Sequence, residues 1–111
     1  MNMNDTLDIE QMTRNAAYAS RFLKTLANER RLMILCHLVE GEKSVGELER
    51  LLQMRQPALS QQLTKLREEK LVATRRESRT IYYRMASDEA LAVLGKLHEL
   101  FCGAASDAEA G

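Results

Sequence analysis

Proline and glycine are scarce in this sequence of 111 residues, which contains one proline and five glycines. Because these residues mark turns and irregular loops, their scarcity argues against a β-rich or loop-rich fold. The abundant leucine, alanine, glutamate and arginine residues favour helices. No apolar run approaches the roughly 20 residues that a membrane-spanning helix needs, and the polar, acidic N-terminus does not resemble a signal peptide. We therefore expect a mainly helical, cytoplasmic protein of one domain.

The sequence also has no net charge, since 16 basic residues balance 16 acidic ones. A nucleic-acid partner is nevertheless compatible with this balance, because the distribution of charge matters more than its sum. Residues 55–84 contain eight lysines and arginines against three glutamates, a local excess of five positive charges. Residues 85–111 contain one basic residue against five acidic ones. The basic stretch could focus a positive field on a phosphate backbone.

Apolar residues recur at every third or fourth position in two segments ahead of the basic stretch, which predicts two helices. The first spans Ile9–Leu26 and follows a polar lead, residues 1–8, that we expect to be loose. The second spans Glu29–Val39, with Asn28 as its N-cap and Gly41 beyond its end. Its inner stripe is expected to comprise Leu32, Leu35 and Val39, widened by Met33, Ile34 and Leu38.

A third and shorter helix is predicted over Val45–Leu52, because Ser44 and Glu47 have the spacing of a capping box. Its inward-facing residues are expected to be Val45, Leu48, Leu51 and Leu52. Residues 53–55 then form a turn. Two helices separated by so short a turn make a helix-turn-helix, whose second helix enters the major groove of DNA.

The recognition helix of this motif is predicted over residues 57–70, with Pro57 in its first turn, where the missing N–H costs nothing. Its back is formed by Leu59, Leu63 and Leu66. The candidate DNA contacts on its other sides are Gln56, Ser60, Gln61, Gln62, Thr64 and Lys65. The glutamines suit the edge of adenine, and the hydroxyls suit phosphate oxygens. The alternative interpretation is a polar face that only meets solvent.

A short β-hairpin is predicted from residues 71–76 and Thr80–Met85, which are rich in β-branched and aromatic side chains. Its tip carries Arg75, Arg76 and Arg79. A basic hairpin directly after a recognition helix is the wing of a winged helix, and these arginines would reach phosphates or the minor groove. The alternative is a solvated edge whose charges prevent sheet aggregation. The local excess of positive charge favours the DNA interpretation.

A last helix is predicted over residues 89–102, capped by Ser87 and Asp88. Apolar residues lie nearly all round it, so it requires burial against the first helix or a partner chain. The small, polar tail, residues 103–111, is expected to be disordered. The sequence thus predicts one mainly α-helical domain over residues 9–102, a winged helix-turn-helix with five helices and a small β-hairpin.

Two long strings in the sequence resemble the ArsR family of bacterial winged-helix repressors. These are LKTLANERRLMILCHLVEGEKSVGELERLL and QPALSQQLTKLREEKLVATRRESRTIYYRM. The resemblance extends from about Met12 to Cys102, nearly the whole chain. It implies a homodimer joined through the first and last helices. It also implies repression of transcription by binding a palindromic operator in double-stranded DNA.

The metal ligands of this family have no counterpart here. Family members that sense metals through two third-helix cysteines differ from this chain, which has Ser44 and Gly46 at those positions. Others use an Asp-x-His motif on the last helix, where this chain has Asp88, Glu89 and Ala90. For His37 and His98 we favour roles in packing or at the surface, because zinc wants four ligands. We expect no metal and no cofactor.

The resemblance is greatest to a thiol-based subgroup that responds to sulfide and persulfide. That subgroup has one cysteine on the second helix and one on the last, and Cys36 and Cys102 match these positions. The resemblance implies that persulfides or reactive oxygen species oxidise the pair into a bridged form that releases DNA. Arg30 and Arg31 are weak candidates for lowering the pKa of Cys36.

Several alternatives remain open at this point. Either cysteine could simply pack as a small hydrophobe. The regulator could respond to peroxide through a plain disulfide, or act by displacing another repressor. A thiol oxidoreductase is disfavoured, because the sequence lacks a Cys-x-x-Cys motif, and we expect no enzymatic activity. A helical interaction module that binds no DNA is the remaining alternative.

Overall fold

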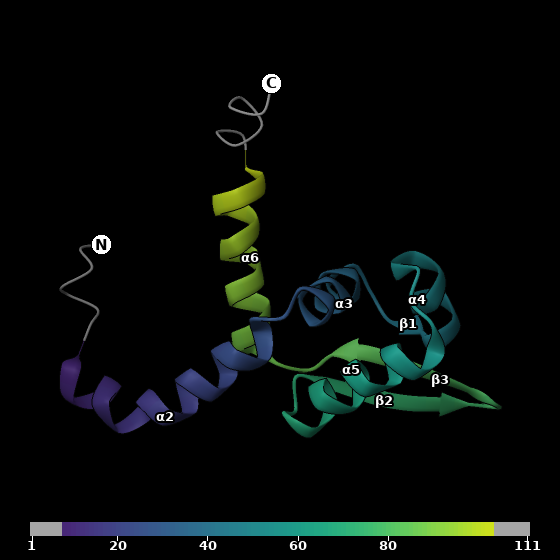
Figure 1. Cartoon of the computed structure of the whole chain (residues 1–111). Helices are drawn as coiled ribbons and strands as arrows, with labels where there is room; N and C mark the ends of the chain where they lie inside the picture. The colour runs from purple at the N-terminus through teal and green to yellow at the C-terminus, as the bar shows by residue number, and fades with distance from the viewer. Residues whose placement is uncertain (1–7, 104–111) are drawn as a thin grey trace.

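The computed structural model describes residues 8–103, which form five helices and a three-stranded antiparallel sheet. The polar lead and the disordered tail that we expect from the sequence fall largely on residues 1–7 and 104–111, outside the described residues. In chain order the elements are α2 (Ile9–Leu26), α3 (Glu29–Val39), β1 (Lys43–Ser44), α4 (Val45–Leu52), α5 (Gln56–Glu68), β2 (Val72–Glu77), β3 (Thr80–Met85) and α6 (Asp88–Cys102) (Figure 1). The prediction of a mainly helical winged helix-turn-helix is confirmed.

Side-chain caps fix where most of these helices begin. Asn28 accepts a hydrogen bond from the backbone N–H of Arg31, and Ser87 accepts one from Ala90. Ser44 and Glu47 form the predicted capping box at the start of α4. Asp8, which the sequence analysis assigned to the loose lead, is instead the N-cap of α2.

The recognition helix α5 differs slightly from its prediction. It begins at Gln56, one residue before Pro57, and it ends at Glu68 rather than at residue 70. Lys70 lies outside the helix because its backbone is left-handed, with φ of +63°. A left-handed residue ends a helix by turning the chain away from its axis. The turn carries the chain directly into the wing.

The wing is a hairpin in which β2 pairs with β3 from Val72 opposite Met85 to Glu77 opposite Thr80. Ser78, at the tip, has a φ of +59°. Beyond the prediction, the two-residue strand β1 pairs with β3, so that the strand order is β1-β3-β2. The wing is thereby anchored to the segment between α3 and α4.

The hydrophobic core lies between α3, α4, α5 and the sheet. Its fully buried side chains include Ile34, Leu35, Leu48, Leu59, Leu63 and Leu66, so the predicted leucine back of α5 is confirmed. The predicted inward positions of Val39 and Leu51 are wrong, because these side chains are 46% and 49% exposed. The predicted inward positions of Leu35, Leu38 and Leu48 are confirmed, because these side chains are buried.

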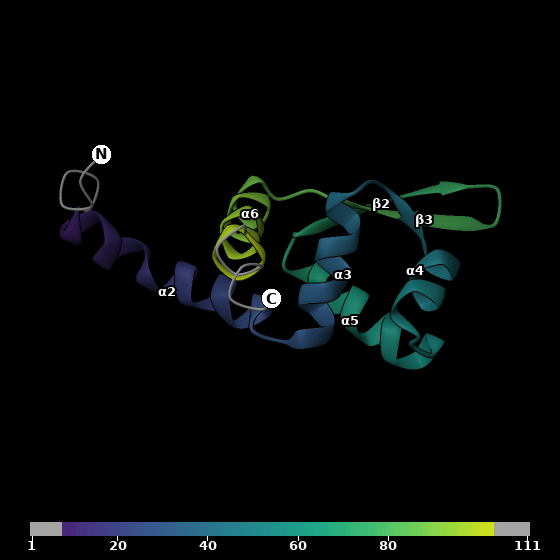
Figure 2. The ribbon, with the colours of Figure 1, turned by 90° about the horizontal axis from the view of Figure 1, so that it is seen from above.

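Helices α2 and α6 project from this body. In Figure 1, α2 extends away from the sheet and α6 rises from the junction between α2 and the body, and Figure 2 shows the same arrangement from above. Helix α6 buries only Ala90 and Leu94, whereas Phe101 is 72% exposed. The predicted burial of α6 on two sides is therefore absent from the single chain. No helix within residues 8–103 is long and apolar enough to cross a membrane.

Candidate nucleic-acid interface and thiol pair

A tight turn sets α5 relative to α4. Gln53 adopts a left-handed conformation, with φ of 53° and ψ of 44°, and its N–H donates to the carbonyl oxygen of Glu49. The N–H of Met54 donates to the same carbonyl at 3.2 Å. The second helix of the predicted helix-turn-helix therefore starts after three residues, as the sequence analysis proposed.

The polar front of α5 remains accessible. Gln61, Thr64 and Lys65 are exposed, while Ser60 is half-buried and its hydroxyl donates to the side-chain oxygen of Gln56. The ammonium group of Lys65 lies 3.7 Å from a carboxylate oxygen of Glu69. This surface offers amides, hydroxyls and one cation, which are the groups that meet base edges and phosphates.

Gln62, a DNA contact in the sequence-based prediction, instead pairs with a residue of the protein. Its side chain is half-buried, and its Oε1 accepts a hydrogen bond of 3.0 Å from Nη1 of Arg31, on α3. Its acceptor atom is therefore engaged within the protein. The bidentate contact to adenine that the sequence suggests requires this same acceptor.

The wing arginines fall into two groups. Arg75 forms a bidentate ion pair with Glu42, with the shortest contact 2.7 Å, and also contacts Glu77 at 3.3 Å. Its guanidinium lies 4.4 Å from the ring centroid of Tyr82, a cation–π contact. Arg76 and Arg79 are exposed and form no ion pair within residues 8–103.

The Arg75–Glu42 pair shifts both pKa values. The hydrogen bond from Arg75 lowers the pKa of Glu42, and the carboxylates of Glu42 and Glu77 raise the pKa of Arg75. Both groups are charged at neutral pH. The positive charge of Arg75 is therefore largely balanced within the wing, whereas that of Arg76 and Arg79 is available to a phosphate backbone.

The two cysteines lie on α3 and at the end of α6, and both are free and exposed. Partial burial raises the pKa of the Cys36 thiol, and the charge of Cys102 raises it further. The alternative that either cysteine packs as a buried small hydrophobe is wrong, because both side chains are exposed.

The suggestion that Arg30 or Arg31 lowers the pKa of Cys36 is wrong, because that pKa is raised. The guanidinium of Arg31 points instead toward the end of α2 and toward Gln62. His37 lies 3.7 Å from a carboxylate oxygen of Glu40. In the part of the chain that the structure describes, no cluster of three or more histidine, cysteine or acidic residues is arranged to hold a metal ion.

Sequence reasoning missed the residues that support these surfaces, above all Arg31 and Glu42. One signal was available for Arg31. Cations in the first turn of a helix oppose its macrodipole, so an arginine three residues after the N-cap Asn28 indicates a specific partner. No comparable signal exists for Glu42, which lies 33 residues from its partner Arg75.

Comparisons with known proteins agree with this geometry. A model of the arsR family of bacterial regulatory proteins matches residues 28–74. The chain is 47% identical to the transcriptional activator HlyU of Vibrio cholerae over 88% of this chain and 91% of the other. It is 48% identical to the biofilm growth-associated repressor of Agrobacterium fabrum over 86% and 82% of the two chains. The solved structure of the transcriptional repressor BigR from Xylella fastidiosa, 45% identical, matches with a TM-score of 0.82 and covers 86% of this chain and 98% of that one.

Proposed function

Because the chain belongs to the ArsR family of bacterial regulatory proteins, we propose that it is a homodimeric repressor whose operator binding is controlled by Cys36 and Cys102. The family identifies it as a DNA-binding transcriptional regulator. The observation that carries the thiol control is the presence of two free, exposed cysteines on separate helices, α3 and α6. Inducers of this switch would be per- or polysulfides, with reactive oxygen species as the other candidate.

The exposed apolar side chains of α2 and α6 support the dimer. They are Ile9, Met12, Tyr18 and Leu23 on α2 and Leu91, Leu100 and Phe101 on α6. A monomer rarely leaves so many large apolar groups on two adjoining helices, and a second copy would remove them from water. Two-fold symmetry would then match a palindromic operator.

Operator DNA is proposed to bind across α5 and the wing. The residues proposed to contact it are Gln56, Ser60, Gln61, Thr64 and Lys65 on α5 and Arg75, Arg76 and Arg79 on the wing. Figure 1 shows the hairpin projecting from the body on the side away from α2. The recognition helix would lie in the major groove while the hairpin follows the neighbouring backbone.

The proposed switch is a thiol–disulfide exchange. One cysteine thiolate attacks the outer sulfur of a persulfide RSSH, the S–S bond breaks, and RSH leaves as the cysteine persulfide forms. The second thiolate attacks the cysteine sulfur and expels hydrosulfide, which leaves a disulfide between the helices. Two thiols and one RSSH thus give one disulfide, RSH and H₂S. Reaction with a second RSSH would give a trisulfide bridge, with a second RSH as the additional product.

Such a bridge would join α3, which packs against α5, to the end of α6. The core of the DNA-reading part and the proposed dimer helix would then be covalently linked. In the proposed switch, the dimer has a reduced arrangement that binds DNA and a bridged arrangement that releases it. The covalent link would favour the second arrangement, which is the general form of an allosteric switch.

A mobility-shift titration at fixed salt tests this proposal. We expect polysulfide to weaken binding of the wild-type protein to its promoter DNA. Cys36→Ser and Cys102→Ser should bind as the reduced wild type does and should lose the response. Wild-type binding that polysulfide leaves unchanged would contradict the thiol control, while absence of any specific DNA binding would contradict the repressor itself.

A second candidate function is a regulator that displaces another repressor and so raises transcription. The 47% identity to a protein named a transcriptional activator favours it. Deletion of the gene discriminates between the two. A repressor predicts that transcription from the bound promoter rises, whereas the displacing regulator predicts that it falls.

A further inference from the structure

The side chain of Arg31 connects three elements. From α3, its Nε donates to the carbonyl oxygen of Thr25 at 2.7 Å, and its Nη2 donates to that of Lys24 at 3.4 Å. Its Nη1 donates to Oε1 of Gln62, on α5, at 3.0 Å. The carbonyls in the last turn of a helix lack partners within the helix, and a cation there is also favoured by the macrodipole. Arg31 thus joins the end of α2 to the middle of the recognition helix.

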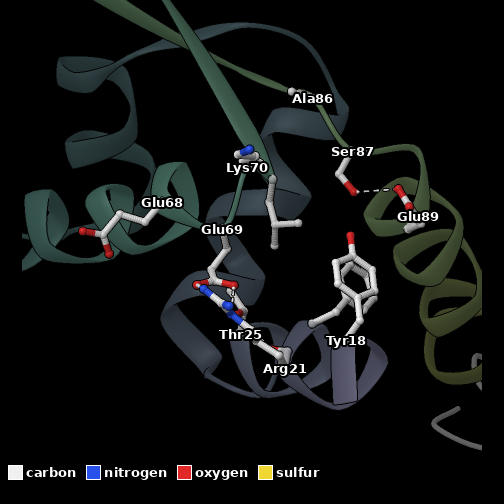
Figure 3. Close-up of a pocket in the computed structure, with 11 residues that line it drawn as sticks. Tyr18, Arg21, Thr25, Glu68, Glu69, Lys70, Ala86, Ser87 and Glu89 are labelled. Atoms are coloured by element: carbon white, nitrogen blue, oxygen red, sulfur yellow. Dashed lines mark hydrogen bonds and ion pairs between the residues drawn. The ribbon is translucent and has the colours of Figure 1, made fainter. Parts of the chain in front are cut away.

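A second contact joins the same part of α2 to α5. The guanidinium of Arg21 forms a two-pronged ion pair with Glu69, with distances of 2.8 Å and 2.9 Å, as Figure 3 shows. Glu69 is the C-cap of α5, and the hydrogen bond from Arg21 lowers its pKa. Thr25, which is buried, donates from its hydroxyl to the carbonyl oxygen of Arg21. The end of α2 therefore holds α5 at two points.

Both points lie on one flank of α5. Gln62 and Glu69 are seven residues apart, which is close to two helical turns and places them on the same side of the helix axis. Gln62 follows the front residue Gln61 and precedes the buried residue Leu63. The flank thus separates the polar front from the leucine back.

We propose that Arg31 and Gln62 are positioning residues that set the rotation of α5 about its own axis. The leucine back holds α5 on the core, but apolar contacts are not directional and tolerate small rotations. The hydrogen bond from Arg31 to Gln62 is directional, so it fixes which side chains face outward. The inference rests on the proposed function, since it matters only if α5 reads DNA.

This assignment gives Gln62 a role inside the protein rather than at a base edge. It also explains why the residue on α3 is an arginine. A planar guanidinium can donate to two backbone carbonyls and a side-chain amide at once, whereas the single ammonium of a lysine cannot reproduce that fork. Arg31 thereby fixes the position of α5 relative to α2, the proposed dimer helix.

The test compares operator binding with binding to unrelated DNA. The operator probe is the duplex that the wild-type protein enriches most from a randomised library, and the reference is a duplex that it does not enrich. Arg31→Lys and Gln62→Ala should each lower the operator-to-reference affinity ratio about tenfold, the scale of one hydrogen bond to a charged group. The double variant should lose no more than the larger of the two single losses, because the Arg31–Gln62 contact is common to both variants.

Two further variants separate positioning from electrostatics and from folding. Gln62→Glu retains an acceptor for Arg31, so it should keep the affinity ratio even though its charge weakens all DNA binding. Arg30→Lys, at the exposed neighbouring position, should also keep the ratio. Circular dichroism at the assay temperature verifies that each variant is folded.

The outcomes distinguish this inference from the proposed function. Variants that enrich the same operator with an unchanged ratio, or a double variant whose loss is the sum of the two, would overturn the role of Arg31 and Gln62 alone. A wild-type protein that enriches no duplex would overturn operator binding, and this inference with it.

Discussion

Cys36 is an exposed thiol whose pKa the fold shifts from its ordinary value. Its pKa is raised by partial burial and then by the charge of Cys102, so at neutral pH it is mostly a protonated thiol. Because the thiolate is the nucleophile, a raised pKa slows the reaction of Cys36 with oxidants at neutral pH. The contribution of Cys102 to this shift can be tested in solution.

We predict that Cys102→Ser lowers the pKa of Cys36, because it removes one of the two causes that raise it. The pH profile of Cys36 alkylation by iodoacetamide, followed by mass spectrometry of its peptide, should therefore move to lower pH. Glu99→Gln, which removes another acidic group from α6, should leave the profile in place. An unchanged profile in Cys102→Ser would mean that the thiols are too far apart to interact.

Some residue roles could not be predicted because they depend on partners distant in the sequence. The sequence identified the exposed front of α5, since Gln61, Thr64 and Lys65 follow from helical periodicity alone. It could not identify the partners of Gln62 and Arg75. Their side chains are fixed by residues 31 and 33 positions away, and single-sequence patterns contain no such pairing.

In the wing, such a distant partner affects the charge that the hairpin presents to DNA. Its basic tip looks uniform in sequence, yet Glu42 neutralises Arg75 while Arg76 and Arg79 remain exposed. A phosphate approaching the wing would have to compete with Glu42 for the guanidinium. Glu42 thus limits how strongly this hairpin attracts DNA of any sequence.

We predict that Glu42→Gln strengthens DNA binding and steepens its salt dependence. Arg75, then paired with Glu77 alone, could neutralise one more phosphate, which would increase the slope of log K against log salt concentration by about 0.9. Fluorescence anisotropy over a salt series measures this slope.

Glu40→Gln is the matched control, because it removes the same charge two residues earlier but does not contact Arg75. Glu40→Gln should change the DNA affinity slightly and should leave the slope of log K against log salt concentration unchanged. Equal slopes in wild type and Glu42→Gln would contradict the competition between Glu42 and phosphate.

At the level of elements, the sequence predicted the helices and both strands of the hairpin to within about two residues, but it did not predict strand β1. Repeats such as Leu59, Leu63 and Leu66 persist over several turns, and caps such as Ser44 mark where helices begin. Strand β1 has only two residues and therefore no alternation to recognise. It forms because β3 offers Tyr82 and Tyr83 as pairing partners, which is a tertiary effect.

At the scale of the whole molecule, the single chain leaves apolar surface exposed on two helices. Helices α2 and α6 leave their apolar side chains in solvent, and α6 buries only two residues (Figures 1 and 2). The prediction that α6 is buried on two sides followed from its composition. The proposed second copy would satisfy it by covering these side chains.

We predict that Phe101→Asp shifts the protein from dimer to monomer, because a charge would replace a side chain that is 72% exposed in the monomer and buried in the proposed dimer. Sedimentation velocity measures the change. Leu51→Asp alters a half-exposed apolar residue on α4, far from α6 in Figure 2, and should remain a dimer. If Phe101→Asp sediments as the wild type does, α6 is not part of the interface.

The central claim is that a bridge between Cys36 and Cys102 lowers the affinity for operator DNA. The most direct measurement isolates the bridged protein, verifies its linkage by mass spectrometry, and compares operator Kd before and after reduction of the same sample. The account predicts a Kd at least about tenfold higher for the bridged form, an allosteric coupling of about 1.4 kcal/mol, and full recovery on reduction. Equal Kd values for the bridged and reduced forms would contradict it.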